Sequence, residues 1–418
     1  MNITKNTMNK EPSGEYYDWT ITGKPERPWL LPYHQCLVWK IMNCYKDEDG
    51  GLKEVLFTFE QTLEVIERFN NMSLGMPQVV YLTGWQFNGH DSKYPSLDEA
   101  NVHLKRKQDD TAEESLRWLI REAREKFNCR VSLHINMMDA YKDSPLWDEY
   151  VEKDIVAKDV DGNLIEGGVW GGVVSYPMSY TQEWKHGLAQ KRIDNLIKMI
   201  PEIVDTQTIH IDAFLGARKA GQKEPISPYL GFTKEEEAST QRKIYRYFRD
   251  KGIDVTSEWA FGLRNDRSVG LQPWSWHQED KLNDLPDELY CSTKFVNSDM
   301  WLIEDPINPP NAREKFYGEV LPWYYSNNKN ASGEQKMIDG GDICMPALWC
   351  KEKTIIAYSE NGYQNKQWEL PQNWSEIKSC SVEKITVHGL ENKKTIEVVD
   401  GKITLSLDTK ESIKISPL

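Results

Sequence analysis

Cysteine is sparse in this chain and follows no recognisable pattern. The seven cysteines among 418 residues stand at positions 36, 44, 129, 291, 344, 350 and 380. None forms a CxxC pair, and none clusters with histidine at metal-ligand spacing, which argues against a structural zinc ion. An odd number of scattered thiols also argues against a disulfide framework. Free thiols of this kind fit a reducing compartment.

Long hydrophobic runs are absent as well. No stretch approaches the ~18 apolar residues of a membrane-spanning helix. The N-terminal segment is polar and lacks the apolar core of a signal peptide. We therefore expect a cytoplasmic protein with no membrane partner. A secreted chain trimmed of its leader would look the same.

Positive charge is in deficit, because 51 Lys and Arg face 65 Asp and Glu and the net charge is −14. A phosphate-binding surface needs the opposite sign, so we expect no nucleic-acid partner. Neither a GxGxxG nor a P-loop motif occurs, so nothing marks a nucleotide cofactor.

Aromatic residues are what the chain does have, with 16 Trp, 19 Tyr and 11 Phe. Flat aromatic faces are the surfaces on which sugar rings stack. Tryptophan also fills protein cores, so this enrichment alone does not decide between the two uses.

Short apolar strands alternate with amphipathic helices after a polar lead-in over residues 1–25. We expect strands at 55–59, 77–85, 129–136, 208–214 and 253–260, and helices at 60–70, 109–127, 183–200 and 234–252. This alternation is the pattern of a parallel sheet with helical crossovers. A doubly wound open sheet would look alike, but without a nucleotide motif a (β/α)8 TIM-like barrel over residues 26–340 is the better interpretation.

The character of the chain changes near its C-terminal end. Residues 341–418 contain short β-branched segments separated by Gly, Asn and Asp turns, with almost no helical periodicity. We expect a C-terminal antiparallel β-sandwich appended to the barrel.

Polar side chains recur where the predicted strands end. They are Asp91, His134, Asn136, Asp212 and Glu258. In a (β/α)8 barrel these ends gather at one face and build the active site. Taken singly, each has a plainer interpretation: a strand-end Asp is more often a helix cap than a nucleophile, and a strand His is often a hydrogen-bonded core residue.

Two of these residues suit a glycosidic bond hydrolysed with retention. That reaction uses two carboxyl groups about 5–5.5 Å apart, one as nucleophile and one as acid/base. Glu258 stands between Ser257 and Trp259. A carboxyl group against an indole favours its protonated form, as an acid requires, whereas Asp212 beside polar groups stays ionised.

At these residues the sequence resembles the endo-α-N-acetylgalactosaminidases, glycoside hydrolase family one hundred and one, and related α-N-acetylgalactosaminidases. FNGHDSKYP is similar to the family's GHDSGH loop, SLHINMMDAY to its GVHVNASE strand, IHIDAF to its VDVW strand, TSEWAF to its IEWG strand and LQPW to its FQHW segment. The order of the segments is also the same, over roughly residues 75 to 415.

The resemblance implies a retaining hydrolase of α-linked N-acetylgalactosamine (GalNAc) on O-glycans or glycopeptides. It assigns the nucleophile to Asp212 and the acid/base to Glu258. The substrate-binding residues that it implies are His90, Asp91, His134, Asn136, Trp170, Trp259, Gln272 and Trp274.

Departures from the family pattern affect the expected specificity. The second histidine of the GHDSGH loop is absent, since Lys93 and Tyr94 follow Ser92. The family's tandem-Trp lid is reduced to EGGVWGGV, with Trp170 alone among glycines. Either endo release of a Gal-β1,3-GalNAc disaccharide or exo release of GalNAc therefore stays open.

Two alternatives remain at this stage: a non-catalytic glycan-binding barrel, and a retaining hydrolase of another α-glycoside. The carbohydrate is the expected partner in each case. The chemistry calls for no metal ion or other cofactor, although a structural calcium ion leaves little spacing signature.

Overall fold

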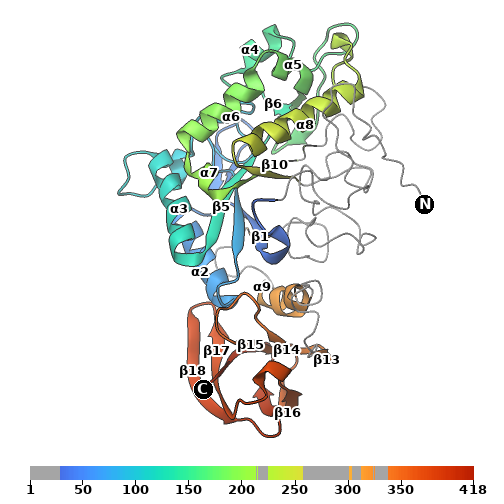
Figure 1. The fold of residues 1–418 in the computed structure, drawn as a ribbon. Coiled ribbons are helices and arrows are strands. Elements are labelled where there is room, and N and C mark those ends of the chain that lie inside the picture. The colour runs from blue at the N-terminus through green and yellow to red at the C-terminus, as the bar shows by residue number, and fades with distance from the viewer. Residues whose placement is uncertain are drawn as a thin grey trace, which may run out of the picture.

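The computed structural model describes residues 29–212, 214, 225–257, 312–322, 324 and 338–418, together with the backbone of 301–303. The predicted lead-in over residues 1–25 lies outside these ranges. The chain is mixed α/β, with a parallel sheet in its larger part and antiparallel strands at its C-terminal end (Figure 1).

The central sheet has the strand order β11-β10-β5-β4-β1-β12, and every pairing in it is parallel. Its strands are β1 (Leu37–Met42), β4 (Gln78–Thr83), β5 (Cys129–Ile135), β10 (Thr208–Ile211), β11 (Asp254–Ser257) and β12 (Trp301–Ile303). The strands predicted at 77–85, 129–136 and 208–214 are thus confirmed with shorter bounds. The strand predicted at 253–260 is confirmed over Asp254–Ser257, and residues 258–260 lie outside the described ranges. β12 follows β11 in sequence but pairs with β1 at the opposite edge. A closed barrel stays a prediction.

Helices connect these strands and cover the sheet. They are α2 (Phe59–Met72), α3 (Ala112–Phe127), α4 (Trp147–Glu152), α5 (Tyr180–Lys185), α6 (Leu188–Met199), α7 (Glu202–Thr206), α8 (Lys234–Asp250) and α9 (Ala312–Lys315), which continues as the π-helical η8 (Phe316–Val320). Short 3-10 turns are η1 (Tyr33–Gln35), η2 (Val102–Leu104), η4 (Pro228–Leu230) and η10 (Gln372–Trp374). α3 and α7 pack on β5, and α8 packs on β11. No helix in the described ranges is long and apolar enough to cross a membrane.

Two local expectations were wrong. The strand expected at 55–59 does not form: Val55 is the last residue of β3 (Leu52–Val55), and Thr58 caps α2 with its side chain while Gln61 completes a capping box. The first strand of the sheet is instead β1, whose residues are all buried. The helix expected at 183–200 is divided into α5 and α6 at Gly187, whose φ of 70° is left-handed and interrupts the helical path.

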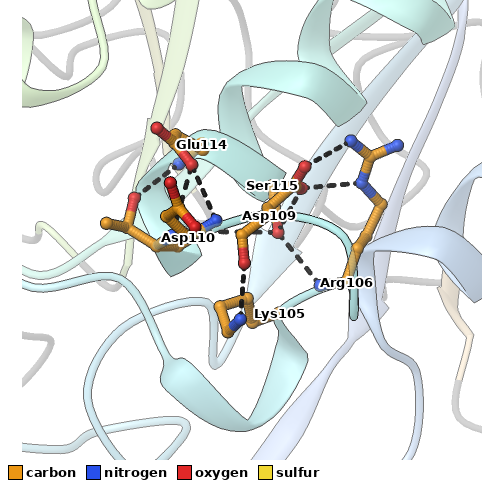
Figure 2. A network of polar contacts seen from close by, with 7 residues as sticks. Lys105, Arg106, Asp109, Asp110, Glu114 and Ser115 are labelled. Carbon is orange, nitrogen blue, oxygen red and sulfur yellow. Dashed lines mark hydrogen bonds and ion pairs between the residues drawn. The ribbon is translucent and has the colours of Figure 1, made fainter.

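A polar network fixes the start of α3 (Figure 2). Arg106 donates to both carboxylate oxygens of Asp109 at 2.7 Å, and Ser115 donates to the same carboxylate at 2.7 Å. Thr111 and Glu114 form a capping box. The network anchors the point where the long β4–α3 connection, which carries His90 and Asp91, returns to a helix.

The C-terminal part consists of two antiparallel sheets. The larger has the order β13-β14-β15-β20-β17-β18, and the smaller pairs β16 with β19. The strands are β13 (Ile338–Asp339), β14 (Asp342–Pro346), β15 (Ile355–Ser359), β16 (Tyr363–Glu369), β17 (Ser379–Thr386), β18 (Gly389–Glu397), β19 (Lys402–Leu407) and β20 (Glu411–Pro417). Trp368 of β16 and Ile403 of β19 share a buried core with Ile355 and Ile415 of the larger sheet.

This C-terminal part lies beyond α2 and α9 in Figure 1 and contacts the helical layer. Asn71 of α2 donates to the Val387 carbonyl at 3.1 Å, and Arg313 of α9 donates to the Ser412 hydroxyl of β20 at 2.9 Å. The antiparallel character is as predicted. A complete sandwich, and the domain limits at residues 26, 340 and 341, stay predictions.

Candidate active site

The candidate site lies at the carboxyl ends of β4, β5 and β10. His134 is the penultimate residue of β5, and Asp212 directly follows β10. His210 of β10 pairs with His134 in the sheet register, and the Asp212 amide donates to the Ile135 carbonyl at 2.7 Å. Parallel strands align their carboxyl ends at one edge, so residues from distant parts of the sequence meet here.

Asp212 and His134 are in direct contact. The Nε2 atom of His134 lies 3.5 Å from Oδ2 of Asp212. The His134 side chain is 3% exposed and that of Asp212 is 17% exposed, so the carboxylate reaches the surface of the site while the imidazole lies beneath it. The predicted nucleophile is therefore accessible and supported by a buried polar ring.

The ring of His134 lies between two other histidine rings. Its centroid is 5.3 Å from that of His90, which it meets edge-on, and 5.2 Å from that of His210. His210 was not among the site residues predicted from the sequence. The signal was the alternation in IHID, which places His210 and Asp212 on the same face of one strand.

A buried chain of hydroxyl groups lies behind His210. Its Nδ1 atom is 2.9 Å from Oγ1 of Thr256, and the Thr256 hydroxyl lies 3.0 Å from the hydroxyl of Tyr81. Tyr81 and Tyr33 each lie 2.7 Å from the hydroxyl of Thr208. These bonds hold the histidine ring in place from the interior of the sheet.

His90, His134 and Asp212 also form a possible metal-ligand set. One ligand atom from each residue lies within 4.8 Å of the others. Two imidazoles and a carboxylate are ligands that zinc and similar ions prefer. The described part of the chain offers no other such group of three.

The connection after β4 forms the second wall of the site, and we call residues 84–95 the Asp91 loop. Asp91 has a left-handed backbone with φ of 58°, and its Oδ2 atom lies 3.5 Å from Nε2 of His90. The amide of His90 donates to the carbonyl of Cys44 at 2.9 Å, which ties the loop to β2 (Cys44–Lys46).

Two buried tyrosines, Tyr94 and Tyr141, stand near the carboxylates of this site. Burial raises the pKa of both phenols, and the charges of Asp91 and Asp212 raise it further. Both phenols therefore stay protonated and can donate hydrogen bonds. Both tyrosines lie within the sequence motifs, in FNGHDSKYP and SLHINMMDAY, but neither was among the predicted site residues.

Asn136 is engaged in a turn rather than directed to open space. Its Oδ1 atom accepts from the amides of Met138 and Asp139 at 2.8 and 2.9 Å, and its Nδ2 atom donates to Asp139 at 2.8 Å. Arg192 of α6 contacts this turn, since it donates to the Asn136 carbonyl at 3.5 Å as well as to the Pro95 carbonyl at 2.7 Å, and buried Glu183 pairs with it at 2.8 Å. Asn136 shapes the end of β5 next to His134.

Trp170 lies on a small hairpin, formed by β7 (Val169–Trp170) and β8 (Val173–Val174), and is 50% exposed. We call residues 169–174 the Trp170 hairpin. β8 borders a cavity of about 290 Å³ that is lined by Glu48, Asp49, Gly50, Lys142, Asp143, Glu166, Val173, Val174 and Tyr176. Within the described part of the chain, no hydrogen bond, ion pair or ring contact joins Trp170 to the His134–Asp212 pair.

The remaining predicted site residues, Glu258, Trp259, Gln272 and Trp274, lie outside the described residues. The structure nevertheless describes strand β11, which ends at Ser257, the residue before Glu258. Ile211 pairs with Ser257 in the parallel register of β10 and β11. The residues that immediately precede Asp212 and Glu258 are thus neighbours across one strand pair.

Comparison with known proteins gives a family match and several structural likenesses. The profile of the endo-alpha-N-acetylgalactosaminidase family matches residues 54–309. No curated protein matches the chain in sequence. An alpha-N-acetylgalactosaminidase, NagBb, from Bifidobacterium bifidum in complex with GalNAc has 14% identity and a TM-score of 0.47, over 64% of this chain and 43% of that one.

Two further solved structures are similar at the same level. Ligand-free NagBb has 16% identity and a TM-score of 0.42, over 59% of this chain and 38% of that one. An alpha-galactosidase from Thermus thermophilus in complex with stachyose has 15% identity and a TM-score of 0.38, over 68% of this chain and 55% of that one. The chain thus spans well under two thirds of the length of these proteins. Because the family profile covers more than half of the chain, the chain belongs to the endo-alpha-N-acetylgalactosaminidase family.

Proposed function

We propose that the protein is a retaining glycosidase that cleaves α-linked GalNAc from O-glycans or glycopeptides, with Asp212 as nucleophile and Glu258 as acid/base. The observation that carries this proposal is the strand register: Ile211 pairs with Ser257, and each is followed directly by one of the two carboxylic acids.

Strand spacing supports the reaction type. Neighbouring strands lie about 4.7–4.9 Å apart. Two carboxyl groups that leave adjacent strands at the same level can therefore approach the roughly 5–5.5 Å that a double displacement with retention requires. In the first step Asp212 would attack the anomeric carbon while Glu258 protonates the leaving oxygen. In the second, Glu258 would take a proton from the water that releases the sugar.

The surroundings of Asp212 support its assigned role. Its carboxylate is partly exposed, as attack on a sugar requires, and His134 lies within 3.5 Å of it. His90, the Asp91 carboxylate and the phenols of Tyr94 and Tyr141 supply polar groups for sugar hydroxyls on the same side of the site. The reduced Trp170 hairpin supports a specificity that differs from the disaccharide preference of endo-acting relatives.

The proposal is tested with p-nitrophenyl α-GalNAc and the p-nitrophenyl core 1 disaccharide side by side. Cleavage of the first alone indicates exo action, and cleavage of the second alone indicates endo action. Asp212→Asn and Glu258→Gln should each reduce turnover by at least about 10³-fold, since each removes a group that acts in the transition state.

Asp205→Asn provides the matched control, because its side chain is 66% exposed and far from the chemistry. It should retain wild-type activity. A wild-type protein that binds GalNAc but releases no sugar would instead favour a glycan-binding barrel. Near-wild-type rates in either active-site variant would refute the residue assignment.

A further inference from the structure

Lys46, the last residue of β2, is a lysine that is almost completely buried beside the candidate site. Only 4% of its surface is exposed. It precedes residue 54, where the family match begins, and no part of the motif comparison included it. A lysine is seldom buried without a partner for its charge. The groups that contact this ammonium group therefore show which part of the site the lysine stabilises.

The ammonium group of Lys46 contacts two segments of the site. Its Nζ atom donates to the Asp91 carbonyl at 2.5 Å and lies 4.0 Å from the centroid of the Tyr141 ring. Burial lowers the pKa of Lys46, while the carboxylates of Asp91, Asp143 and Asp139 oppose that shift. A charged donor to a carbonyl makes a stronger hydrogen bond than a neutral one.

The backbone that Lys46 holds is conformationally disfavoured. Asp91 has φ of 58° and Lys93 has φ of 57°, a region that residues with a side chain rarely adopt. Gly89 has φ of 129°, and a Cβ atom there would lie 2.7 Å from the Cys44 carbonyl oxygen. The Asp91 loop therefore packs closely on β2 in a disfavoured backbone conformation, which contacts from neighbouring residues must stabilise.

The aliphatic part of Lys46 supports a third segment. A Cβ atom added at Gly171 would lie 3.6 Å from Cε of Lys46, so the turn of the Trp170 hairpin rests on this stem. One side chain thus joins the Asp91 loop, Tyr141 and the Trp170 hairpin. Each of these segments contains a residue that we place in or beside the sugar site.

We propose that Lys46 is a positioning residue: its ammonium group holds the Asp91 loop in the conformation that presents the Asp91 carboxylate to the sugar. This inference rests on the proposed function, because Asp91 matters to a substrate only if the site binds a sugar. Lys46 itself does not touch the reacting atoms. It acts through Asp91.

The first test compares Lys46→Met and Lys46→Arg with Lys53→Met, an exposed lysine of the neighbouring strand β3 (Leu52–Val55). Lys46→Met keeps the stem and removes the charge. It should lower kcat/KM on p-nitrophenyl α-GalNAc by about ten- to a hundredfold, mainly through KM, because a small displacement of a binding group is costly. Lys46→Arg should recover part of this loss, and Lys53→Met should behave as wild type.

A double-mutant cycle separates positioning from mere stabilisation of the fold. If Lys46 acts through Asp91, Lys46→Met should have little further effect in an Asp91→Asn background. Effects that multiply would show that the lysine acts independently and would overturn the proposal. A lower Tm with unchanged KM would overturn it as well.

Hydrogen exchange tests the same idea without substrate. The amides of residues 89–93 should exchange faster in Lys46→Met than in wild type or Lys53→Met. Unchanged exchange overturns the positioning role even if the enzyme is active. Faster exchange in a protein that cleaves no α-GalNAc substrate would support the positioning role and reject only the proposed function. If Lys46→Met does not fold, Lys46→Arg replaces it in the kinetic and hydrogen-exchange measurements. It keeps the charge but moves the donor, so a smaller loss in kcat/KM and a smaller rise in exchange are expected.

Discussion

At the scale of single residues, His134 is the centre of the candidate site. Its ring contacts Asp212 directly and lies between the rings of His90 and His210. Removing it leaves a buried gap beside the Asp212 carboxylate and takes away one polar partner of that group. Its main effect should therefore be on the chemistry at Asp212.

We predict that His134→Ala lowers kcat/KM by roughly 10- to 100-fold, the equivalent of losing one hydrogen bond to a charged group of about 1.5–3 kcal/mol. Steady-state kinetics on the aryl α-GalNAc substrate measure this change. His186→Ala is the control, because that histidine is exposed at the end of α5. A His134→Ala enzyme with unaltered kinetics would contradict the role of the pair.

The ligand set of His90, His134 and Asp212 leads to a second prediction at this scale. Zn²⁺ should inhibit hydrolysis in competition with substrate, because a bound ion would occupy the Asp212 carboxylate. Rate measurements against Zn²⁺ concentration test this, with EDTA expected to restore activity. His90→Ala should weaken the inhibition. Inhibition of equal strength in that variant would place the ion elsewhere.

At the scale of elements, helix starts matter because the site lies on the connections between strands and helices. The connection from β4 carries His90 and Asp91 and ends at the capped start of α3. Thr111 accepts from the Glu114 amide at 3.2 Å, and the Glu114 side chain bonds back to the Thr111 amide at 3.3 Å. The nearby Asp109 carboxylate accepts from Arg106 and Ser115 (Figure 2).

We expect Thr111→Ala to reduce the free energy of unfolding by about 0.5–2 kcal/mol, the usual cost of losing an N-cap side chain. Chemical denaturation measures it, with Glu125→Ala at an exposed position of the same helix as the control. Since the cap lies away from the strand ends, kcat should change little. A variant as stable as wild type would show that the Asp109 network caps α3 sufficiently by itself.

At the scale of the whole molecule, Asp254 links the segment around Leu30, which precedes β1, to the parallel sheet. It is fully buried on β11, pairs with Arg249 of α8 at 3.1 Å and accepts from the Leu30 amide at 2.6 Å. Burial raises the pKa of Asp254 to about 6, although Arg249 opposes the shift.

This raised pKa predicts a pH dependence of stability. The folded state binds the Asp254 proton more tightly than the unfolded chain, whose Asp pKa is about 3.9. The contribution of Asp254 to the free energy of unfolding is therefore fully present below about pH 4 and is lost as the pH rises through about 6. Asp254→Asn should remove this part of the pH profile of Tm between pH 4 and 8. An unchanged slope in the variant would assign the dependence to other groups.

Much of the parallel sheet follows from local sequence. β4, β5, β10 and β11 are runs of buried residues between amphipathic helices, and each lay within its predicted range. Strand and helix periodicity are properties of neighbouring residues, so a sequence displays them directly. The exact ends of helices were harder to predict. Thr58 is the N-cap of α2, where the sequence suggested a strand, and Gly187 separates α5 from α6, where the sequence suggested one helix.

The sequence by itself determined the family, the strand-end positions of His134 and Asp212, and the position of Asp91 on the connection after β4. Only the tertiary structure decided that Asp212 contacts His134, that His210 backs that pair, and that Lys46 reaches the Asp91 carbonyl. The physical reason is that these contacts join residues of different strands and hairpins. Their distances depend on sheet register and on how the β2–β3 hairpin packs, and no pattern of neighbouring residues encodes either one.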